Sequence, residues 1–506
     1  MVRKKMLAAG LGVILAATVV GCSSNSPSST SSSGSAASSP VVLGLGAAPA
    51  SLDFTTTDGA AIPQVLLDNV YEGLVKLDPA GKIVGDLAKS WTVSSDNLTY
   101  DFTLRDGVKF SNGDPFNADA VKFSIERVKS PAWTISLKSY MDAVSTVDVV
   151  SPTEVKVTLS KPSNDWLFYM TTRIGAMFDP KAISDLANSA IGTGPYTVAQ
   201  FNRGQSVVLK ANKDYWGGAP AVPQVTFQYY TDANAENAAL LSGSINAIVT
   251  LASYDSLAQF QNNSKFEIDK GSTTSKVTLS MNNASGPFTN KTLRQAVEYA
   301  IDRKALVNDA VGGYGDVTGS FVPPTDPWYE DLSGDYPYNP DKAKQLVDQA
   351  GMKGKTINFA VPNVPATMMT AAQIVQSDLA KVGLNAKITS MSFPAQWLST
   401  VFNNHNYDMS IINHVEQRDL PTYADPTYYW GYNNPAVQKL IADGQAGTAQ
   451  DQVSNYKKAM KIISDDAVAD WLYLDDNVNI VQRGLTGLPK NTASEALYVG
   501  DLKFTK

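Results

Sequence analysis

Residues 98–116 read LTYDFTLRDGVKFSNGDPF, and the first part of this stretch decides what kind of sheet the chain contains. Apolar side chains occupy every even position from Leu98 to Leu104, with polar side chains between them. Such strict alternation predicts an antiparallel strand with one buried face and one exposed face. The residues RDG at 105–107 then supply a turn.

A helix is predicted directly downstream of this stretch. Asn117 is a typical N-cap residue, and Asp119 adds a negative charge in the first turn. Val121, Ile125 and Val128 recur at helical spacing, so they should form the buried stripe of the helix.

Further strands and helices are expected on both sides of this region. Residues 41–45 are an apolar run typical of a buried strand. A second buried strand is expected at 407–412, and a short strand at 386–388. Helices are expected at 62–70, at 293–301, from Pro340 behind the N-cap Asn339, and at 368–382, where Gly383 ends the helix. This mixture predicts an α/β fold.

The length and charge of the chain limit its organisation and partners. A single core stops growing at roughly 250–300 residues, so a chain of 506 residues should form two or more lobes. The formal net charge is -7, whereas a surface that reads phosphates needs clustered Lys and Arg. Nucleic acid is therefore not an expected partner.

The N-terminus is typical of a bacterial lipoprotein export signal. Arg3, Lys4 and Lys5 precede an apolar stretch at 6–20, which is shorter than the roughly 20 residues of a membrane-spanning helix. The sequence VVGC ends at Cys22, which is expected to carry the lipid. The alternative is an ordinary buried cysteine.

Cys22 is the only cysteine, so it can form no intrachain disulfide and no cysteine cluster for zinc or iron–sulfur. The residues that follow, 23–40, are mostly Ser with Gly, Ala and Pro. They cannot bury enough apolar surface to offset their ordering entropy, which predicts a flexible tether.

A series of short motifs resembles the large peptide-, nickel- and oligosaccharide-type solute-binding proteins of ABC importers. These motifs are SLD at 51–53, YEGLV at 71–75, LAKSW at 87–91, LRDGVKF at 104–110 with NGDPF at 112–116, GTGPY at 192–196, NKDYW at 212–216, and LRQAV at 293–297 with AIDR at 300–303. Each is weak alone, but their order along the chain matches the family from about Leu52 to Asp476.

The resemblance implies a two-lobed fold of the periplasmic-binding-protein type, type II, with an extra subdomain on the first lobe. The implied segments are a signal at 1–21, a tether at 22–40, the first lobe at 41–75, 192–276 and 483–506, the extra subdomain at 76–191, and the second lobe at 277–482. The alternating strand at 98–105 would then lie in the extra subdomain.

The same resemblance implies a monomeric binding protein, without cofactor or catalytic residues, held at the outer face of the cytoplasmic membrane by its lipid. It would pass a small solute to the permease and ATPase subunits of an ABC importer.

The expected ligand segment follows the strand at 407–412, since polar groups at strand ends between lobes commonly contact ligands in open α/β sheets. Its candidate residues are His414, Glu416, Gln417, Arg418, Asp419, Tyr423 and Trp430. In peptide-binding relatives an aspartate here holds the ligand's amino group, and Gln417 occupies that position, so Glu416 or Asp419 would have to substitute. The alternative is a solvated loop in which Arg418 pairs with Asp419.

Three further candidates follow from the family's layout: Asp58 near the start of the first lobe, Trp133 in the extra subdomain, and Tyr473 near the strand that crosses between lobes. For each, plain packing or exposure is an equal alternative.

The chain lacks the residue patterns of several other functions. Its two histidines, His405 and His414, cannot form a cage of several imidazoles, and no GxSxG motif is present. Residues 351–356, GMKGKT, have too short a Gly spacing for a phosphate loop and should end a helix before a strand. Neither a metal site built from protein ligands nor a nucleophile–histidine pair is predicted, and a metal held by a chelating ligand stays open as an alternative.

Among solutes, an oligopeptide is the first choice and an oligosaccharide the second, because Tyr428, Tyr429 and Trp430 could stack on sugar rings. A lipid-anchored hydrolase shares the export signal but lacks a recognisable catalytic group. A surface chaperone or signalling receptor on the same scaffold stays open.

Overall fold

The computed structural model describes residues 39–57, 59–251, 253–363 and 366–505. The predicted export signal, Cys22 and most of the predicted tether therefore lie outside the described residues, as does Asp58. Within the described ranges, every helix is too short or too polar to cross a membrane.

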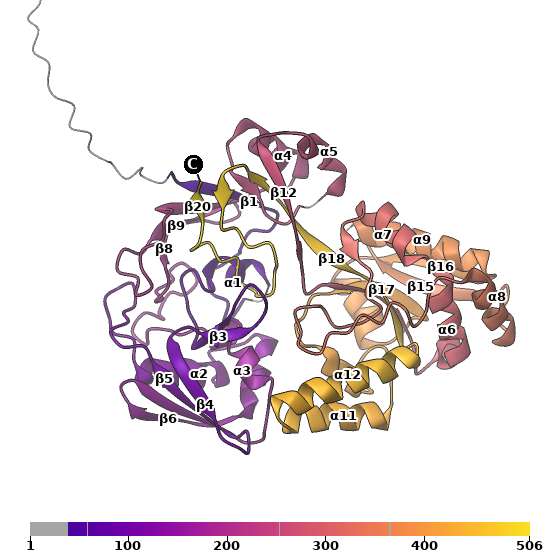
Figure 1. Cartoon of the computed structure of the whole chain (residues 1–506), viewed down its shortest axis with the longest axis horizontal. Coiled ribbons are helices and arrows are strands. Elements are labelled where there is room, and N and C mark those ends of the chain that lie inside the picture. The colour runs from indigo at the N-terminus through magenta and orange to yellow at the C-terminus, as the bar shows by residue number, and fades with distance from the viewer. Residues whose placement is uncertain (1–38, 58, 252, 364–365, 506) are drawn as a thin grey trace, which may run out of the picture. The chain divides into compact units, whose positions relative to one another are not determined.

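One long strand, β18 (Ala469–Gln482), is shared by two groups of strands (Figure 1). Its first residues pair with β13 (Lys276–Met281), and its last residues pair with β12 (Phe266–Ser272) and β11 (Ala247–Ile248). We call the strands on the β11 side the first half-sheet and those on the β13 side the second half-sheet.

In the first half-sheet, the expected strand at the start of the ordered chain is confirmed as β1 (Val41–Leu45). β1 runs parallel to β10 and β11, and antiparallel strands extend the sheet beyond β10. The strands beyond β10 (Gln224–Tyr229) are β9 (Ser206–Ala211) and β8 (Tyr196–Asn202). The C-terminal part of the chain returns here, since Leu485 and Leu497 pack in the same hydrophobic core as Val41.

A separate small sheet contains the alternating stretch that opened the sequence analysis. Its order is β4 (Ala88–Val93), β5 (Thr99–Leu104), β7 (Glu154–Leu159) and β6 (Val144–Ser151), all antiparallel. Tyr100, Phe102 and Leu104 are buried, which confirms the predicted alternation.

The helix α2 (Ala118–Lys129) packs on the small sheet. The Asn117 side chain accepts a hydrogen bond from the Ala120 N–H, which confirms the predicted N-cap.

The second half-sheet consists of β16 (Asn385–Met391), β15 (Thr356–Pro362), β17 (Met409–His414) and β13, which pairs with β18. Helices cover it and pack on one another. They are α6 (Lys291–Ala300), α7 (Arg303–Val311), α8 (Pro340–Gln349), α9 (Ala366–Lys381), α11 (Pro435–Ala446) and α12 (Ala449–Asp465). The predicted caps at Asn339 and Gly383 are confirmed, because Asn339 accepts from Lys342 N–H and Gly383 has a φ of 91°.

The remaining elements are short. The strands are β2 (Val75–Leu77), β3 (Ile83–Gly85), β14 (Gly315–Asp316), β19 (Leu485–Thr486) and β20 (Lys503–Phe504); the helices are α1 (Ala61–Leu66), α3 (Trp166–Tyr169), α4 (Ala233–Ser242), α5 (Ala258–Gln261) and α10 (Ala395–Trp397). Short segments of 3-10 helix lie at Ser136–Ala143, Arg173–Gly175, Tyr254–Ser256, Gly286–Thr289 and Leu420–Ala424, and a short segment of π-helix lies at Leu398–Asn403.

The predicted helix at 62–70 was too long. α1 ends at Leu66, and Asp68 adopts a left-handed φ of 61° that no right-handed helix can include. Asn69 instead uses its side-chain amide to donate to the carbonyls of Val65 and Leu497. A contact with the distant C-terminal part of the chain therefore helps to fix this turn.

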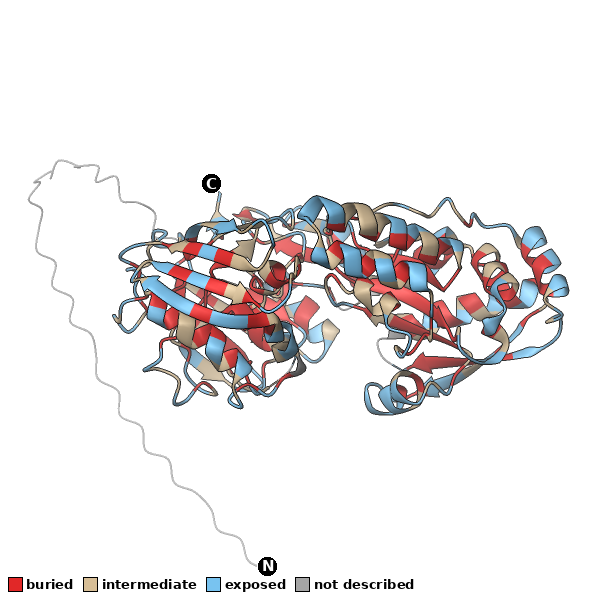
Figure 2. Ribbon diagram, turned by 90° about the horizontal axis from the view of Figure 1, so that it is seen from below, coloured by how far each residue is buried: buried red, intermediate tan, exposed pale blue. Residues whose placement is uncertain are grey.

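Burial follows the layers of the fold (Figure 2). Buried residues concentrate on the strands and on the helix faces that point to them, and exposed residues mark the outer helix faces. The predicted ligand segment begins at the end of β17, and its residue Arg418 lies beside the hairpin of β2 and β3.

Candidate functional site

The segment at 414–419 is tied to the second half-sheet by a buried lysine. The Lys276 side chain on β13 is fully buried, and its Nζ lies 2.9 and 3.0 Å from the two carboxylate oxygens of Asp419. Lys276 also donates to the Glu416 carbonyl. A buried ion pair thus holds the loop after β17 in one conformation, because breaking the pair would leave two buried charges without partners.

Arg418 is the most unusual residue of this segment. Its side chain is 8% exposed, its Nη1 lies 3.9 Å from Asp165 Oδ1, and its Cζ lies 4.0 and 5.3 Å from the rings of Phe168 and Trp328. Among the described residues, its guanidinium makes no hydrogen bond, and its Nε is buried without a partner. The rings stabilise the charge but supply no oxygen acceptor.

The backbone of Arg418 is strained as well. Its φ of 53° lies in the left-handed region, which costs a residue with a Cβ roughly 1–2 kcal/mol. Such conformations persist where the surrounding structure imposes them, and they concentrate at ligand-binding positions.

Asp326 is a buried acid that forms no ion pair with any described residue. It lies in a loop of prolines before Trp328, is 8% exposed, and its carboxylate makes no hydrogen bond to any described residue. Burial raises the pKa of Asp326 to about 7, although the charges of Arg418 and Lys276 act to lower it. An acid in this state gains from any ligand that donates a hydrogen bond to it.

Asp165, in contrast, is satisfied by the protein. Its carboxylate accepts a hydrogen bond of 2.7 Å from Gln452 Nε2 and one of 3.5 Å from the Tyr456 hydroxyl, both on α12. Its neighbour Asn164 donates to the carbonyls of Gly444 and Gly447 at 2.9 and 2.8 Å. The edge of the small-sheet region therefore contacts α11 and α12 through polar groups.

Two cavities adjoin Arg418 and Asp326. The smaller, of about 10 Å³, is lined by both residues together with Phe168, Gln417, Ala493 and others. The larger, of about 420 Å³, is lined by Arg418, the loop at 324–327 and residues 80–83 of the hairpin between β2 and β3. Ligand pockets are typically about 300–1,000 Å³, so the larger cavity has room for a small solute.

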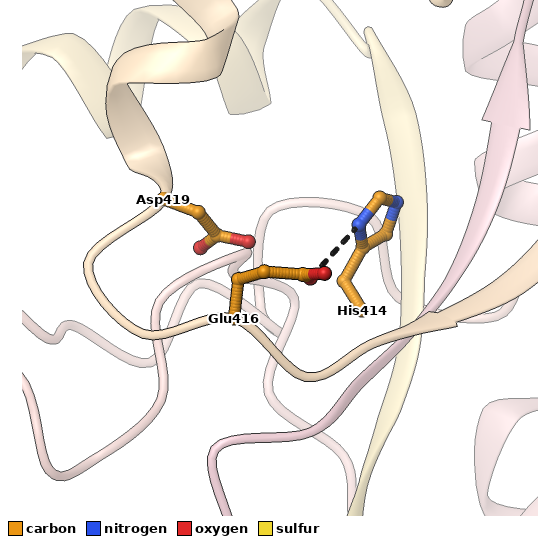
Figure 3. A group of neighbouring side chains, drawn as sticks. All are labelled: His414, Glu416 and Asp419. Atoms are coloured by element: carbon orange, nitrogen blue, oxygen red, sulfur yellow. Dashed lines mark ion pairs between the residues drawn. The ribbon is translucent and has the colours of Figure 1, made fainter. Parts of the chain in front are cut away.

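His414, Glu416 and Asp419 lie together at the end of β17 (Figure 3). His414 Nδ1 lies 3.8 Å from a Glu416 oxygen, and its Nε2 lies 2.9 Å from the Tyr429 hydroxyl. The Lys276 ammonium already neutralises Asp419 at this point, and it would repel a metal cation. The grouping is therefore explained by protein contacts, without a metal.

The other members of the segment have different surroundings. Gln417 Nε2 donates to the Ala493 carbonyl at 2.8 Å, which links the segment to the returning C-terminal chain. Glu416 is exposed. The suggested pairing of Arg418 with Asp419 was wrong, because Asp419 pairs with Lys276 while Arg418 faces Asp165.

The aromatic candidates pack inside the protein. Tyr423 and Trp430 are fully buried and stack on each other with ring centroids 4.1 Å apart, and Tyr429 is buried beside them. Trp133 packs against Phe54 and Phe178. Tyr473 is buried within β18. Neither Trp133 nor Tyr473 lines the two cavities.

Sequence reasoning missed Asp326, Asp165, Phe168 and Lys276. Asp326 lies in the sequence PPTDP at 323–327. An acid among prolines predicts a loop, but it does not predict that the acid contacts a ligand. The other three carry no local signal, since their role depends on elements far apart in the chain.

Comparisons with known proteins agree with this architecture. The family model for bacterial extracellular solute-binding proteins, family 5, matches residues 82–436. The glutathione-binding protein GsiB of Salmonella typhi is 32% identical over 465 residues, which cover 86% of this chain and 90% of that protein.

Solved structures share the two-lobed α/β fold. The ABC transporter substrate-binding protein CtaP of Listeria monocytogenes is 22% identical with a TM-score of 0.82, covering 93% of this chain and all (100%) of its own. The periplasmic binding protein DppA of Helicobacter pylori, in complex with the peptide STSA, is 22% identical with a TM-score of 0.75, covering 92% and 98%.

Proposed function

Because the chain belongs to the bacterial extracellular solute-binding proteins of family 5, and is thus a substrate-binding protein of an ABC importer, we propose that its solute is an oligopeptide. Members of this family bind solutes for transport and are not enzymes. The peptide would lie between the two lobes at the cavities beside Arg418 and Asp326, and the protein would pass it to a membrane permease.

One observation carries the choice of a peptide: a buried guanidinium and a buried carboxylate border the same cavity, and neither side chain makes a hydrogen bond to any described residue. A peptide carries an ammonium that can donate to Asp326 and a carboxylate that can accept from Arg418. A neutral sugar offers no charge to either group. Leaving such groups buried without partners is costly, so a ligand that satisfies both gains affinity.

The named relatives support the same class of solute. GsiB is described as glutathione-binding, and glutathione is a small peptide; DppA of Helicobacter pylori is described in complex with the peptide STSA. A cavity of about 420 Å³ favours a short peptide over a long one.

The oligosaccharide alternative loses its main argument. Stacking on a sugar needs an open aromatic face. The rings of Tyr429 and Trp430 are buried against other aromatic rings, and Tyr428, which packs on both, is the one of the three that is partly exposed.

Calorimetry with defined ligands tests the proposal. We expect heat from a pool of dipeptides and tripeptides that includes glutathione, and none from a set of oligosaccharides. Arg483→Gln, at an exposed ion pair with Glu267, should bind the peptides as the unchanged protein does. Binding of sugars alone would overturn the choice of a peptide.

The proposal extends to the placement of the protein in the cell. Lipid on Cys22 would hold the protein at the outer face of the cytoplasmic membrane, and residues 23–40 would serve as its tether. The lobe boundaries proposed are 41–75, 192–276 and 483–506 for the first lobe, 76–191 for its extra subdomain, and 277–482 for the second lobe.

Fractionation of cells checks the anchor. In a host with lipoprotein processing, Cys22→Ser should move the protein from the membrane fraction to the soluble extracytoplasmic fraction, because one thiol carries the whole anchor. Ser23→Ala, which keeps the thiol, is the matched control. A variant at Cys22 that stays with the membrane would contradict the proposed attachment.

A further inference from the structure

The residues that line the cavity of about 10 Å³ include several with buried polar atoms left without a hydrogen bond. Thr325 Oγ1, Gln417 Oε1 and Arg418 Nε are buried and have no hydrogen-bond partner among the described residues. Asp326 lines the cavity as well, and its carboxylate makes no hydrogen bond to any described residue. Because buried polar atoms of native proteins are nearly always paired with protein or with ordered water, four such groups at one cavity indicate a common partner.

The size and the charges of the cavity decide what that partner is. A volume of about 10 Å³ is about the least that one water molecule needs, and it leaves no room for a larger molecule. The guanidinium of Arg418 repels a small cation, and the carboxylate of Asp326, when ionised, repels a small anion. A single neutral molecule with donors and acceptors remains, and that molecule is water.

We propose that one water molecule is bound in this cavity and hydrogen-bonds to Arg418, Gln417 and Thr325, with Asp326 as its fourth partner. These four groups match a water molecule in number and in kind. The Arg418 Nε–H and the Thr325 hydroxyl donate to its two lone pairs. The Gln417 carbonyl oxygen and the Asp326 carboxylate accept its two protons. The site goes beyond the proposed function, since it does not depend on the identity of the solute.

Two of these partners have no other way to be satisfied. Gln417 Nε2 donates to the Ala493 carbonyl at 2.8 Å, so the amide cannot turn over without losing this bond, and its Oε1 needs a donor from elsewhere. Arg418 forms its ion pair with Asp165 through Nη1, at 3.9 Å, and this pair leaves Nε without an acceptor. One water molecule satisfies both atoms, because it accepts from Nε–H and donates to Oε1.

The walls of the cavity come from two sides of the molecule. Gly81 belongs to the hairpin of β2 and β3, and Ala493 to the C-terminal part of the chain that returns to the first half-sheet. Residues 325–326 and 417–418 belong to loops beside the second half-sheet. The two sides touch, since a Cβ placed on Gly81 would lie 3.1 Å from the Thr325 carbonyl oxygen. The water is therefore enclosed only while the hairpin and these loops are in contact, and it stabilises that contact.

A crystal structure of the protein, at a resolution that shows ordered water, tests the site directly. We expect one water molecule within about 2.5–3.2 Å of Arg418 Nε, Gln417 Oε1 and Thr325 Oγ1. A dry cavity between the same residues, or an ion identified there by its anomalous scattering, would overturn the proposal. Should the crystal hold the hairpin and the loops apart, the comparison of variants in solution decides.

The sign of one substitution distinguishes a cavity that holds water from a dry one. Thr325→Val nearly keeps the shape of the side chain and removes its hydroxyl. In a dry cavity the change removes an unpaired buried hydroxyl, so the midpoint of urea denaturation should rise. With the water bound, the change removes one of its hydrogen bonds. We therefore expect the midpoint to fall and the equilibrium constant of unfolding to rise by about two- to tenfold.

Two matched variants control for the change of side chain. Thr389→Val, at an exposed position of β16, should leave the midpoint close to that of the unchanged protein. Thr325→Ser keeps the hydroxyl and should retain the water in the crystal structure. A midpoint of Thr325→Val at or above that of the unchanged protein, or an equal fall in Thr389→Val, would contradict the water site while the binding of peptides stands.

Discussion

At the residue scale, the site depends on charges that are removed from water. Lys276 and Asp419 satisfy each other, whereas Arg418 and Asp326 do not. A buried charge is tolerated when it is paired and is costly when it is not. Lys276 and Asp419 therefore belong to the framework. Arg418, whose ion pair with Asp165 is long at 3.9 Å, and Asp326 are the candidates for ligand contact.

Lys276→Met should destabilise the protein strongly. The change leaves the Asp419 carboxylate buried without its ion-pair partner, which typically costs about 3–5 kcal/mol of the free energy of unfolding. Urea denaturation measures this. Lys439→Met, which breaks an exposed pair with Asp443 on α11, should cost less than about 0.5 kcal/mol. Equal effects of the two changes would show that the buried pair does not stabilise the loop.

The buried acid Asp326 predicts a pH dependence of stability. The pKa of Asp326 is raised from 3.8 to about 7, so between these values the folded protein holds a proton that the unfolded chain has released. The free energy of unfolding should therefore fall as the pH rises through this window. The charged groups that face Asp326 are Arg418, Lys276, Asp419 and Asp165.

Asp326→Asn should remove this share of the pH dependence. Urea denaturation at several values from pH 4 to pH 7 compares the variant with the unchanged protein, and Asp309→Asn, at an exposed residue of α7, is the control. A difference between Asp326→Asn and the unchanged protein that stays constant with pH would contradict the raised pKa.

At the scale of elements, the C-terminal end of α11 forms polar contacts with the region of the small sheet. The Gly447 carbonyl accepts from Asn97 Nδ2 and Asn164 Nδ2, each at 2.8 Å. Asn97 and Asn164 lie at the edge of the small sheet, far away in the sequence. These bonds hold the small-sheet region against α11 and α12.

Replacing both amides should loosen this contact. Asn97→Ala with Asn164→Ala removes the donors to Gly447, so the ligand-free protein should have a larger radius of gyration in X-ray scattering. Asn433→Ala, at an exposed residue before α11, should leave the radius unchanged. An unchanged radius in the double variant would mean that other contacts hold the halves together.

At the scale of the whole molecule, β18 lets two cores behave as lobes of one protein. Its first part packs with Val277 and Met409 in the core of the second half-sheet, and Val481 packs with Val41 in the core of the first. A solute that contacts both lobes favours the closed arrangement in proportion to how much better it binds there.

Ligand binding should therefore compact the molecule. X-ray scattering at saturation with a peptide found by calorimetry should give a smaller radius of gyration than the ligand-free protein, and Arg418→Gln at the same peptide concentration should give less compaction. No compaction at saturation would argue against closure of the lobes as the means of capture.

The sequence by itself determined the elements and the family. The alternation at 98–104 determined which face of β5 is buried. Asn117 and Asn339 marked where helices begin, and Gly383 marked where one ends. These features could be predicted because they depend only on neighbours along the chain. The sequence also predicts a ligand segment at 414–419, through the resemblance to known binding proteins.

Only the tertiary structure decided which charges of that segment are free. Arg418 could have paired with Asp419 next to it, but Lys276 on β13 takes Asp419, and Arg418 turns to Asp165 and Phe168. Asp326 reaches the same cavity from a proline-rich loop. Whether a charge has a partner depends on residues that only folding brings together. Burial increases the free-energy difference between a paired and an unpaired charge, and the local sequence shows neither the partner nor the degree of burial.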